Sequence, residues 1–202
     1  CGRDWSSDVC SSDLKTGRQI LNERIFHRVL PRDLFLKSMQ AHPPIKVPGT
    51  AVFMYNDPRG SPPALLHNLK HNKVLHETVI ILSIQTADVP ETRREERVFI
   101  EALGHGVFRV VAVYGFMESP DVKEILQRCR DSGIAARPLD TSYFLGREQL
   151  IARRGPWKKG GLSMNIVRKK MFAFMARNAR SATQYFQLPP NRVVELGTQI
   201  EF

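Results

Sequence analysis

The stretch from Val47 to Glu77 constrains the fold of this 202-residue chain most, because it predicts a strand, a turn, a helix and a second strand in succession. An apolar run ends at Met54 and is followed by a loop of residues that favour turns. Pro62-Pro63 can open a helix, since proline is tolerated in the first helical turn, and the leucines that follow share one face. The continuous apolar run at 79–82 is typical of a central parallel strand.

Strand and helix patterns continue to alternate along the rest of the chain. Glycines flank His105 between two apolar runs and predict a hairpin, and Pro120 to Ser132 has the residue pattern of a capped helix. The further elements are strands at 78–86, 97–103, 107–116, 140–145 and 192–200, helices at 16–30 and 162–179, and a charged surface loop at 87–96. We therefore expect an α/β fold in which a mostly parallel sheet carries helices on both faces, with one hairpin.

Three regions are expected along the chain. Residues 1–14 resemble translated sequencing-adaptor sequence and are interpreted as a non-native leader, with a flexible polar leader as the alternative. Residues 15–46 suit a helical connector, and 47–202 form the α/β domain. No window approaches the roughly 20 consecutive apolar residues that a membrane-spanning helix needs. Cys129, on the helix at 120–132, is interpreted as a small buried apolar residue.

Six segments in order carry a resemblance to a known family. They are VPGTAVFM, PPALLHNLKHNKVLHE, RVVAVYGFMESPDV, DTSYFLGRE, FAFMARNARSATQYF and PPNRVVELGTQIEF. Together they resemble the carboxy-terminal region of the KUP/HAK/KT potassium transporters, from about Lys15 to Phe202.

The resemblance implies a cytoplasmic domain that follows the membrane part of a potassium–proton symporter in the bacterial inner membrane. The implied partners are that membrane part and a second copy in a homodimer. Potassium and protons would be handled by the membrane part, so none of the family's ion-coordinating residues is expected in this chain. The implied role is regulatory or dimerising, without catalysis.

In some relatives the corresponding domain resembles the universal stress protein fold and senses adenine nucleotides, including cyclic dinucleotides. If this chain does the same, polar residues near strand and helix ends are the candidates. They are Gly49, Thr50, Asn68, Lys70, Thr141, Ser142 and Arg147. The alternative interpretation assigns these residues to turns and caps.

Two further groups invite a chemical interpretation. His67 and His71 share a helical face and His76 lies close in sequence, but metal sites need three or four converging ligands, so no metal site is expected. The hydroxyls and carboxylate of 140–148 lack a paired base for nucleophilic catalysis. They would instead stabilise the end of a strand, or bind a small ligand at the carboxyl edge of the sheet. The alternative to a transporter domain is a freestanding nucleotide-binding stress protein or enzyme, which would explain the α/β pattern without any membrane partner.

Basic residues are concentrated between Gln149 and Val194, a span without Asp or Glu in a chain of net charge +10. The group includes Arg153, Arg154, Lys158, Lys159, Arg168, Lys169 and Lys170. A solvated face, nucleic-acid binding and an anionic membrane surface all fit such a pattern. The family resemblance favours the anionic inner leaflet, and nucleic acid is not expected as a partner.

The carboxy-terminal residues from Arg192 to Ile200 alternate between apolar and other side chains, which predicts a strand with one apolar side. A strand at the end of a chain is either an internal edge of the sheet or a pairing surface. We expect it to hold the sheet together, with pairing across a dimer as an alternative.

Overall fold

The computed structural model describes residues 32–56, 60–151, 174 and 182–201. The chain divides into two compact units, and nearly all of the described residues belong to the unit made of 30–147 and 181–196. The other unit comprises 1–29, 148–180 and 197–202. The leader 1–14, the helix expected at 16–30 and, except for Phe174, the helix expected at 162–179 lie outside the described residues.

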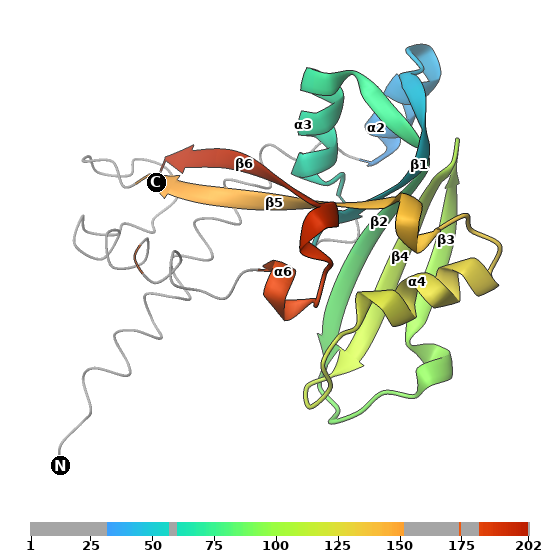
Figure 1. Cartoon of the computed structure of the whole chain (residues 1–202), viewed down its shortest axis with the longest axis vertical. Helices are drawn as coiled ribbons and strands as arrows, with labels where there is room; N and C mark the ends of the chain where they lie inside the picture. Colours follow the sequence, from blue (N-terminus) through green and yellow to red (C-terminus); the bar gives the residue numbers. More distant parts are fainter. Residues whose placement is uncertain (1–31, 57–59, 152–173, 175–181, 202) are drawn as a thin grey trace. The chain divides into compact units, whose positions relative to one another are not determined.

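A six-stranded sheet in the order β3-β4-β2-β1-β5-β6 forms the centre of the fold (Figure 1). β1 pairs in parallel with β2 and β5, β2 pairs in parallel with β4, and β3 is antiparallel to β4. The strands are β1 (Ile45–Met54), β2 (Val74–Ala87), β3 (Val98–Gly104), β4 (Val107–Gly115), β5 (Thr141–Ile151) and β6 (Val193–Glu201). The predicted α/β class with a mostly parallel sheet is confirmed.

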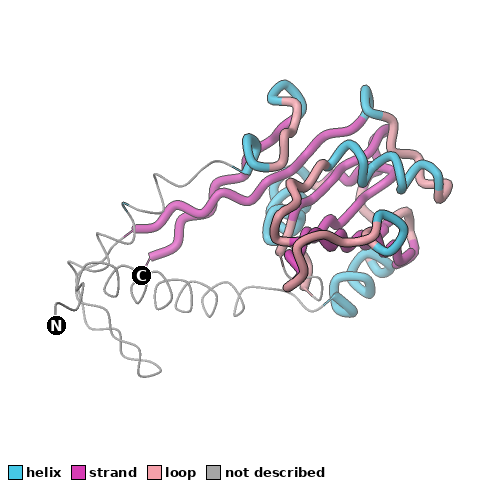
Figure 2. Tube along the Cα trace, turned by 90° about the horizontal axis from the view of Figure 1, so that it is seen from below, coloured by secondary structure: helices cyan, strands magenta, loops and turns pink. Residues whose placement is uncertain are grey.

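Helices cover both faces of this sheet, as Figures 1 and 2 show. α2 (Arg32–Ala41) and α3 (Pro63–Asn72) pack against one face, where Ala51 and Phe53 of β1 lie in the same core cluster. α4 (Val122–Asp131) packs against the opposite face together with Val52. A strand whose successive side chains enter two different cores must be apolar throughout, which explains the continuous apolar runs of β1 and β2.

Short elements complete the described part. The 3-10 turns are η1 (Arg94–Glu96), η2 (Pro138–Asp140) and η3 (Pro190–Arg192), and α6 (Ala182–Tyr185) is a single helical turn. The hairpin glycines Gly104 and Gly106 both have positive φ, as the sequence predicts for the β3–β4 connection.

Two strands are longer than the apolar pattern predicts. β2 begins at Val74 rather than Thr78, because its first residues continue the parallel ladder with the start of β1, where Ile45 pairs with Val74. β5 continues to Ile151 rather than ending at Leu145. Hydrophobic runs mark only the part of a strand that is buried on both faces, whereas backbone pairing continues beyond it.

The strand order also fixes where the chain reverses direction across the sheet. From β1 the chain moves outward to β2 and β4, and after α4 it returns to β5 on the other side of β1. The carboxyl ends of β1 and β5 therefore form a topological switch point, which is where open α/β sheets usually bind ligands.

Candidate functional site

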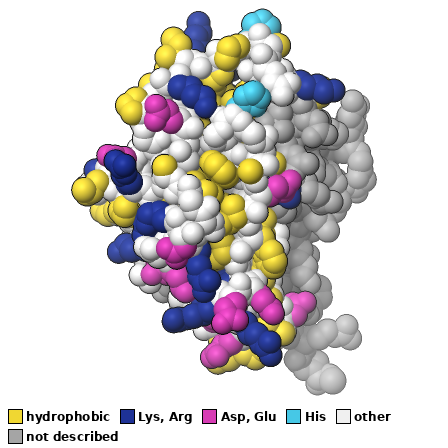
Figure 3. Space-filling model, turned by 90° about the vertical axis from the view of Figure 1, so that its right-hand side faces the viewer, with side chains coloured by type: hydrophobic (Ala, Val, Ile, Leu, Met, Phe, Trp, Pro, Cys, Tyr) yellow, Lys and Arg dark blue, Asp and Glu magenta, His cyan; other side chains and the backbone are white. Residues whose placement is uncertain are grey.

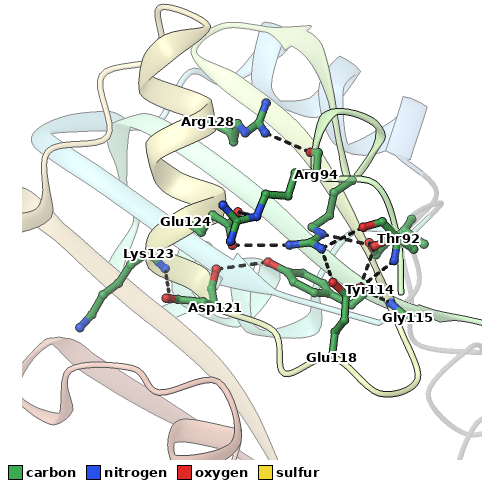
Figure 4. Close-up of polar contacts among 11 residues, drawn as sticks. Thr92, Arg94, Tyr114, Gly115, Glu118, Asp121, Lys123, Glu124 and Arg128 are labelled. Carbon is green, nitrogen blue, oxygen red and sulfur yellow. Dashed lines mark hydrogen bonds and ion pairs between the residues drawn. The ribbon is translucent and has the colours of Figure 1, made fainter. Parts of the chain in front are cut away.

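The most extensive polar cluster in the described residues surrounds Arg97, just before β3. Figure 4 labels its partners Thr92, Glu118 and Glu124. Its side chain is only 8% exposed, and it forms an ion pair and a hydrogen bond with Glu118. A second ion pair joins it to Glu124 of α4 at 3.6 Å, and it donates to the carbonyl of Thr92 at 3.1 Å. The guanidinium carbon lies 4.7 Å from the centre of the Tyr114 ring, which is a cation–π geometry.

Glu118 is the second centre of this cluster. Its carboxylate accepts hydrogen bonds from the backbone N–H of Gly115 at 2.7 Å and from the N–H and hydroxyl of Thr92 at 3.0 and 2.9 Å. These bonds, the one from Gly115 first, lower the pKa of Glu118 below its ordinary value, and Arg97 adds to the effect. The carboxylate therefore connects the loop after β2 to the turn after β4.

The same turn is closed by backbone contacts. Phe116 donates to the carbonyl of Val89 at 3.0 Å and Met117 to that of Pro90 at 3.1 Å. A Cβ on Gly115 would overlap the Pro90 carbonyl, so only glycine lets the two segments approach this closely. Because the donors and acceptors of this cluster bond to one another, we interpret it as a lock that fixes the carboxyl ends of β2 and β4.

The sequence predicts a surface position for the charged loop at 87–96, and most of its side chains are indeed exposed. It does not predict the role of the residue that follows. The apolar pattern makes Arg97 the first residue of a strand, whereas its side chain is buried in the lock. An arginine directly before the apolar run Val98–Ile100 is the available signal, since a charge at the start of a half-buried strand needs a partner.

Two threonines of the predicted nucleotide site lie side by side across β1 and β5. Thr50 pairs with Thr141 in the parallel ladder. The Thr50 hydroxyl donates to the carbonyl of Ala135 at 2.5 Å, and that of Thr141 donates to the carbonyl of Arg137 at 2.6 Å. Both side chains are buried, so their hydroxyls hold the segment that leads into β5.

Gly49 and Ser142 lie close to this pair. Gly49 has φ +102°, and a Cβ there would lie 2.9 Å from the carbonyl oxygen of Asp140, so it permits a close approach of β1 to the start of β5. Ser142 pairs with Ala51. These residues lie at the amino end of β5, whereas ligands of open α/β sheets bind at the carboxyl ends of strands, where the sequence predicts them.

The other candidates lie elsewhere. Asn68 is buried and donates to the carbonyl of Val74 at 3.1 Å, Lys70 is exposed on α3, and Arg147 pairs with Glu195 at 3.0 Å near the far end of β5. The structure thus brings Gly49, Thr50, Thr141 and Ser142 together but not the whole set. Nucleotide binding by these residues stays a prediction.

The histidines do not converge with other ligands. His67 and His71 have ring centres 4.3 Å apart on α3, while His76 lies near the start of β2 in a T-shaped ring contact with Phe144. Burial lowers the pKa of His76. Among the residues that the structure describes, no group of three His, Cys, Asp or Glu side chains could hold a metal ion.

Two further predictions concern Cys129 and the basic group. Cys129 is fully buried in the core under α4, and burial raises its thiol pKa to about 11, which agrees with its interpretation as a small apolar residue. The basic residues from Arg153 to Lys170 lie outside the described residues. In the described ranges no helix is both long enough and apolar enough to cross a membrane.

Comparison with known proteins gives one consistent result. Residues 48–202 match the family model described as "K+ potassium transporter C-terminal domain". A "Probable potassium transport system protein Kup" of Myxococcus xanthus is 51% identical over 93% of this chain and 28% of its own length. Proteins with the same description from Thiobacillus denitrificans and Bdellovibrio bacteriovorus are 50% and 44% identical, over 93% and 92% of this chain. No solved structure matches.

Proposed function

This chain belongs to the family of K+ potassium transporter C-terminal domains, and on that basis we propose that it is the regulatory and dimerising domain of a potassium–proton symporter. The observation that carries the proposal is the alignment: about nine-tenths of this chain matches proteins described as probable potassium transport proteins. The chain spans less than a third of the length of those relatives.

In this proposal the domain carries out no chemistry. Its main partner is the membrane part of the same transporter, and it lies on the cytoplasmic face of the inner membrane. Potassium and protons are bound by that membrane part. The α/β unit is a rigid body that is fixed by two cores and by the Arg97–Glu118 lock. Through this body, conditions on the cytoplasmic side can change the rate of potassium transport.

The experiment is potassium uptake in a bacterial strain that lacks its own potassium transporters. The strain receives either the full-length gene that contains this sequence or the same gene cut before Lys15. We expect growth on low potassium with the full-length gene, and reduced or unregulated uptake with the shortened one. Immunoblots of isolated membranes control for the amount of each protein.

A third gene carries Arg97→Ala in the full-length protein. This substitution removes the centre of the lock and leaves every other residue in place. It therefore tests whether regulation needs the structure of the domain or only the presence of the chain. Equal uptake rates and equal responses to external potassium for all three genes, at equal membrane levels, would contradict the regulatory role.

A further inference from the structure

β3 forms one edge of the sheet, and its outer side has no partner strand among the described residues. Arg97 accepts a backbone hydrogen bond from Val113 of β4 at 2.8 Å, and Val98 lies opposite Ala112. In an antiparallel pair the bonded residues alternate, so Phe99 also bonds to β4 while Val98 and Ile100 direct their backbone N–H and C=O groups outward. The outer edge of β3 therefore offers a regular row of donors and acceptors.

This edge lacks the features that usually prevent strands from pairing with another molecule. Natural edges carry lysines, prolines or bulges. β3 has the sequence VFIEALG, and its single charge, Glu101, is ion-paired with Arg109 of the neighbouring strand. The irregularity in its pairing with β4 comes only after Ala102, which leaves the first part of the strand regular.

Most side chains of β3 are apolar, in addition to the outward-facing backbone groups on its outer edge. Phe99, the second residue of β3, is 58% exposed. Val98 and Ile100, on the opposite face, pack only partly against the core under α4. Figure 3 views the side of the molecule that carries β3 and shows hydrophobic side chains in a band between charged ones.

A second copy of the same strand fits this edge. If two copies of β3 run antiparallel about a two-fold axis at Phe99, the two Phe99 rings face each other in a non-hydrogen-bonded pair, where side chains lie closest. Val98 of each copy then exchanges backbone hydrogen bonds with Ile100 of the other. β3 begins at Val98, so Glu101 lies beyond the last strand pair, at the level of Arg97 of the other copy, whose buried side chain stays in the lock. The pairing therefore places no two acids opposite each other.

We propose that β3 is the strand through which two copies of this chain associate, joining their sheets into one continuous sheet with Phe99 at the two-fold axis. Such a contact is closed, because each copy uses its β3 once. The proposal rests on the dimerising role put forward above and adds the surface and the register. At the other edge, β6 carries two acidic residues, Glu195 and Glu201, whereas β3 carries one.

The first test uses disulfide cross-linking of the whole chain with Cys1 and Cys10 replaced by serine and the buried Cys129 kept. Phe99→Cys should form a covalent dimer under mild oxidation, because Cα atoms in a non-hydrogen-bonded pair are about 4.5 Å apart, within disulfide range. Glu101→Cys is the register control. Its two copies would be separated by four residues along the strand, about 13 Å, and should not cross-link.

The second test measures association without a covalent bond. Phe99→Lys places a charge on the exposed side chain and should raise the dimer dissociation constant by about tenfold or more in sedimentation equilibrium. Val194→Lys, at a partly exposed position of β6, should leave the constant unchanged. Circular dichroism verifies that both variants fold.

Each other result overturns the inference in a recognisable way. A wild-type chain that stays monomeric at every concentration removes both the β3 contact and the dimerising role, while potassium uptake still decides the transporter role. A dimer that is insensitive to Phe99→Lys, or that cross-links through Val194→Cys instead, retains the dimerising role and removes β3. Cross-linking through Glu101→Cys but not Phe99→Cys removes the proposed register.

Discussion

At the scale of single residues, Glu118 makes the stability of the fold depend on pH. The pKa of its carboxyl is lowered from an ordinary value of 4.5, first by the hydrogen bond from the N–H of Gly115. The folded state therefore binds fewer protons than the unfolded chain near that pH, and the stabilisation is present above 4.5 and lost as pH falls through the lowered value.

Replacing Glu118 with glutamine tests this dependence. We expect Glu118→Gln to lower the free energy of unfolding at pH 7, because the charged partner of Arg97 is lost. We also expect a flatter decline of stability below pH 4.5 than in the wild type. Urea unfolding at several pH values measures both effects, and parallel pH profiles for the two proteins would exclude Glu118 as a source of the acid dependence.

Gly115 gives a steric prediction in the same cluster. A methyl group there would overlap the carbonyl of Pro90, so Gly115→Ala should destabilise the fold by about 1–3 kcal/mol, the usual range for overpacking. Gly146→Ala is the matched control. Gly146 also lies in a strand, at an exposed position, but a Cβ added there would meet nothing within 4 Å, so its effect should stay within about 0.5 kcal/mol. Equal losses for the two variants would contradict the close packing.

At the scale of elements, the end of α3 is held by Lys73, which has φ 58° and ψ 17° and donates its N–H to the carbonyl of Leu69 at 3.2 Å. This left-handed conformation costs a non-glycine residue about 1 kcal/mol. Lys73→Gly should therefore stabilise the fold by roughly 0.5–1 kcal/mol. Lys70→Gly, inside the same helix, should destabilise it by about 1 kcal/mol. Thermal unfolding of both variants measures the two changes in stability, and a loss of stability in Lys73→Gly would contradict the prediction.

The elements themselves could largely be predicted from the sequence, because each leaves a local pattern. The period of the apolar residues marks α4, paired glycines mark the β3–β4 turn, and continuous apolar runs mark β1 and β2. The lock around Arg97 could not be predicted in this way. Its members come from a loop, a turn and a helix, and only the strand order brings Thr92, Glu118 and Glu124 around one guanidinium.

The candidate nucleotide residues illustrate the same limit. Thr50 and Thr141 are candidates because they are polar residues near strand ends, and the structure does place them together. The path of the chain between α4 and β5 determines which end of the strand they occupy. It also determines that their hydroxyls donate to the carbonyls of Ala135 and Arg137. Sequence spacing carries no information about that path.

At the scale of the whole molecule, charge is divided unequally along the chain. The net charge of +10 is carried largely by the basic residues between Arg153 and Arg192, a stretch with no acidic residue. A domain that works beside an anionic inner leaflet would gain about 1 kcal/mol for each Lys or Arg held near the surface. We therefore expect the chain to bind vesicles that contain phosphatidylglycerol more strongly than vesicles of phosphatidylcholine alone.

Paired substitutions test whether this basic stretch is the contact. Lys158→Ala together with Lys159→Ala should weaken binding to anionic vesicles by about 30-fold, because two charges contribute about 2 kcal/mol. Lys70→Ala with Lys73→Ala removes the same charge from α3 and the residue that follows it, and should change binding little if the basic stretch alone faces the lipid. Vesicle sedimentation at low and at high salt measures both, since screening should abolish the difference. Equal weakening by the two pairs would instead show that net charge, rather than the stretch around Lys158, governs the attraction.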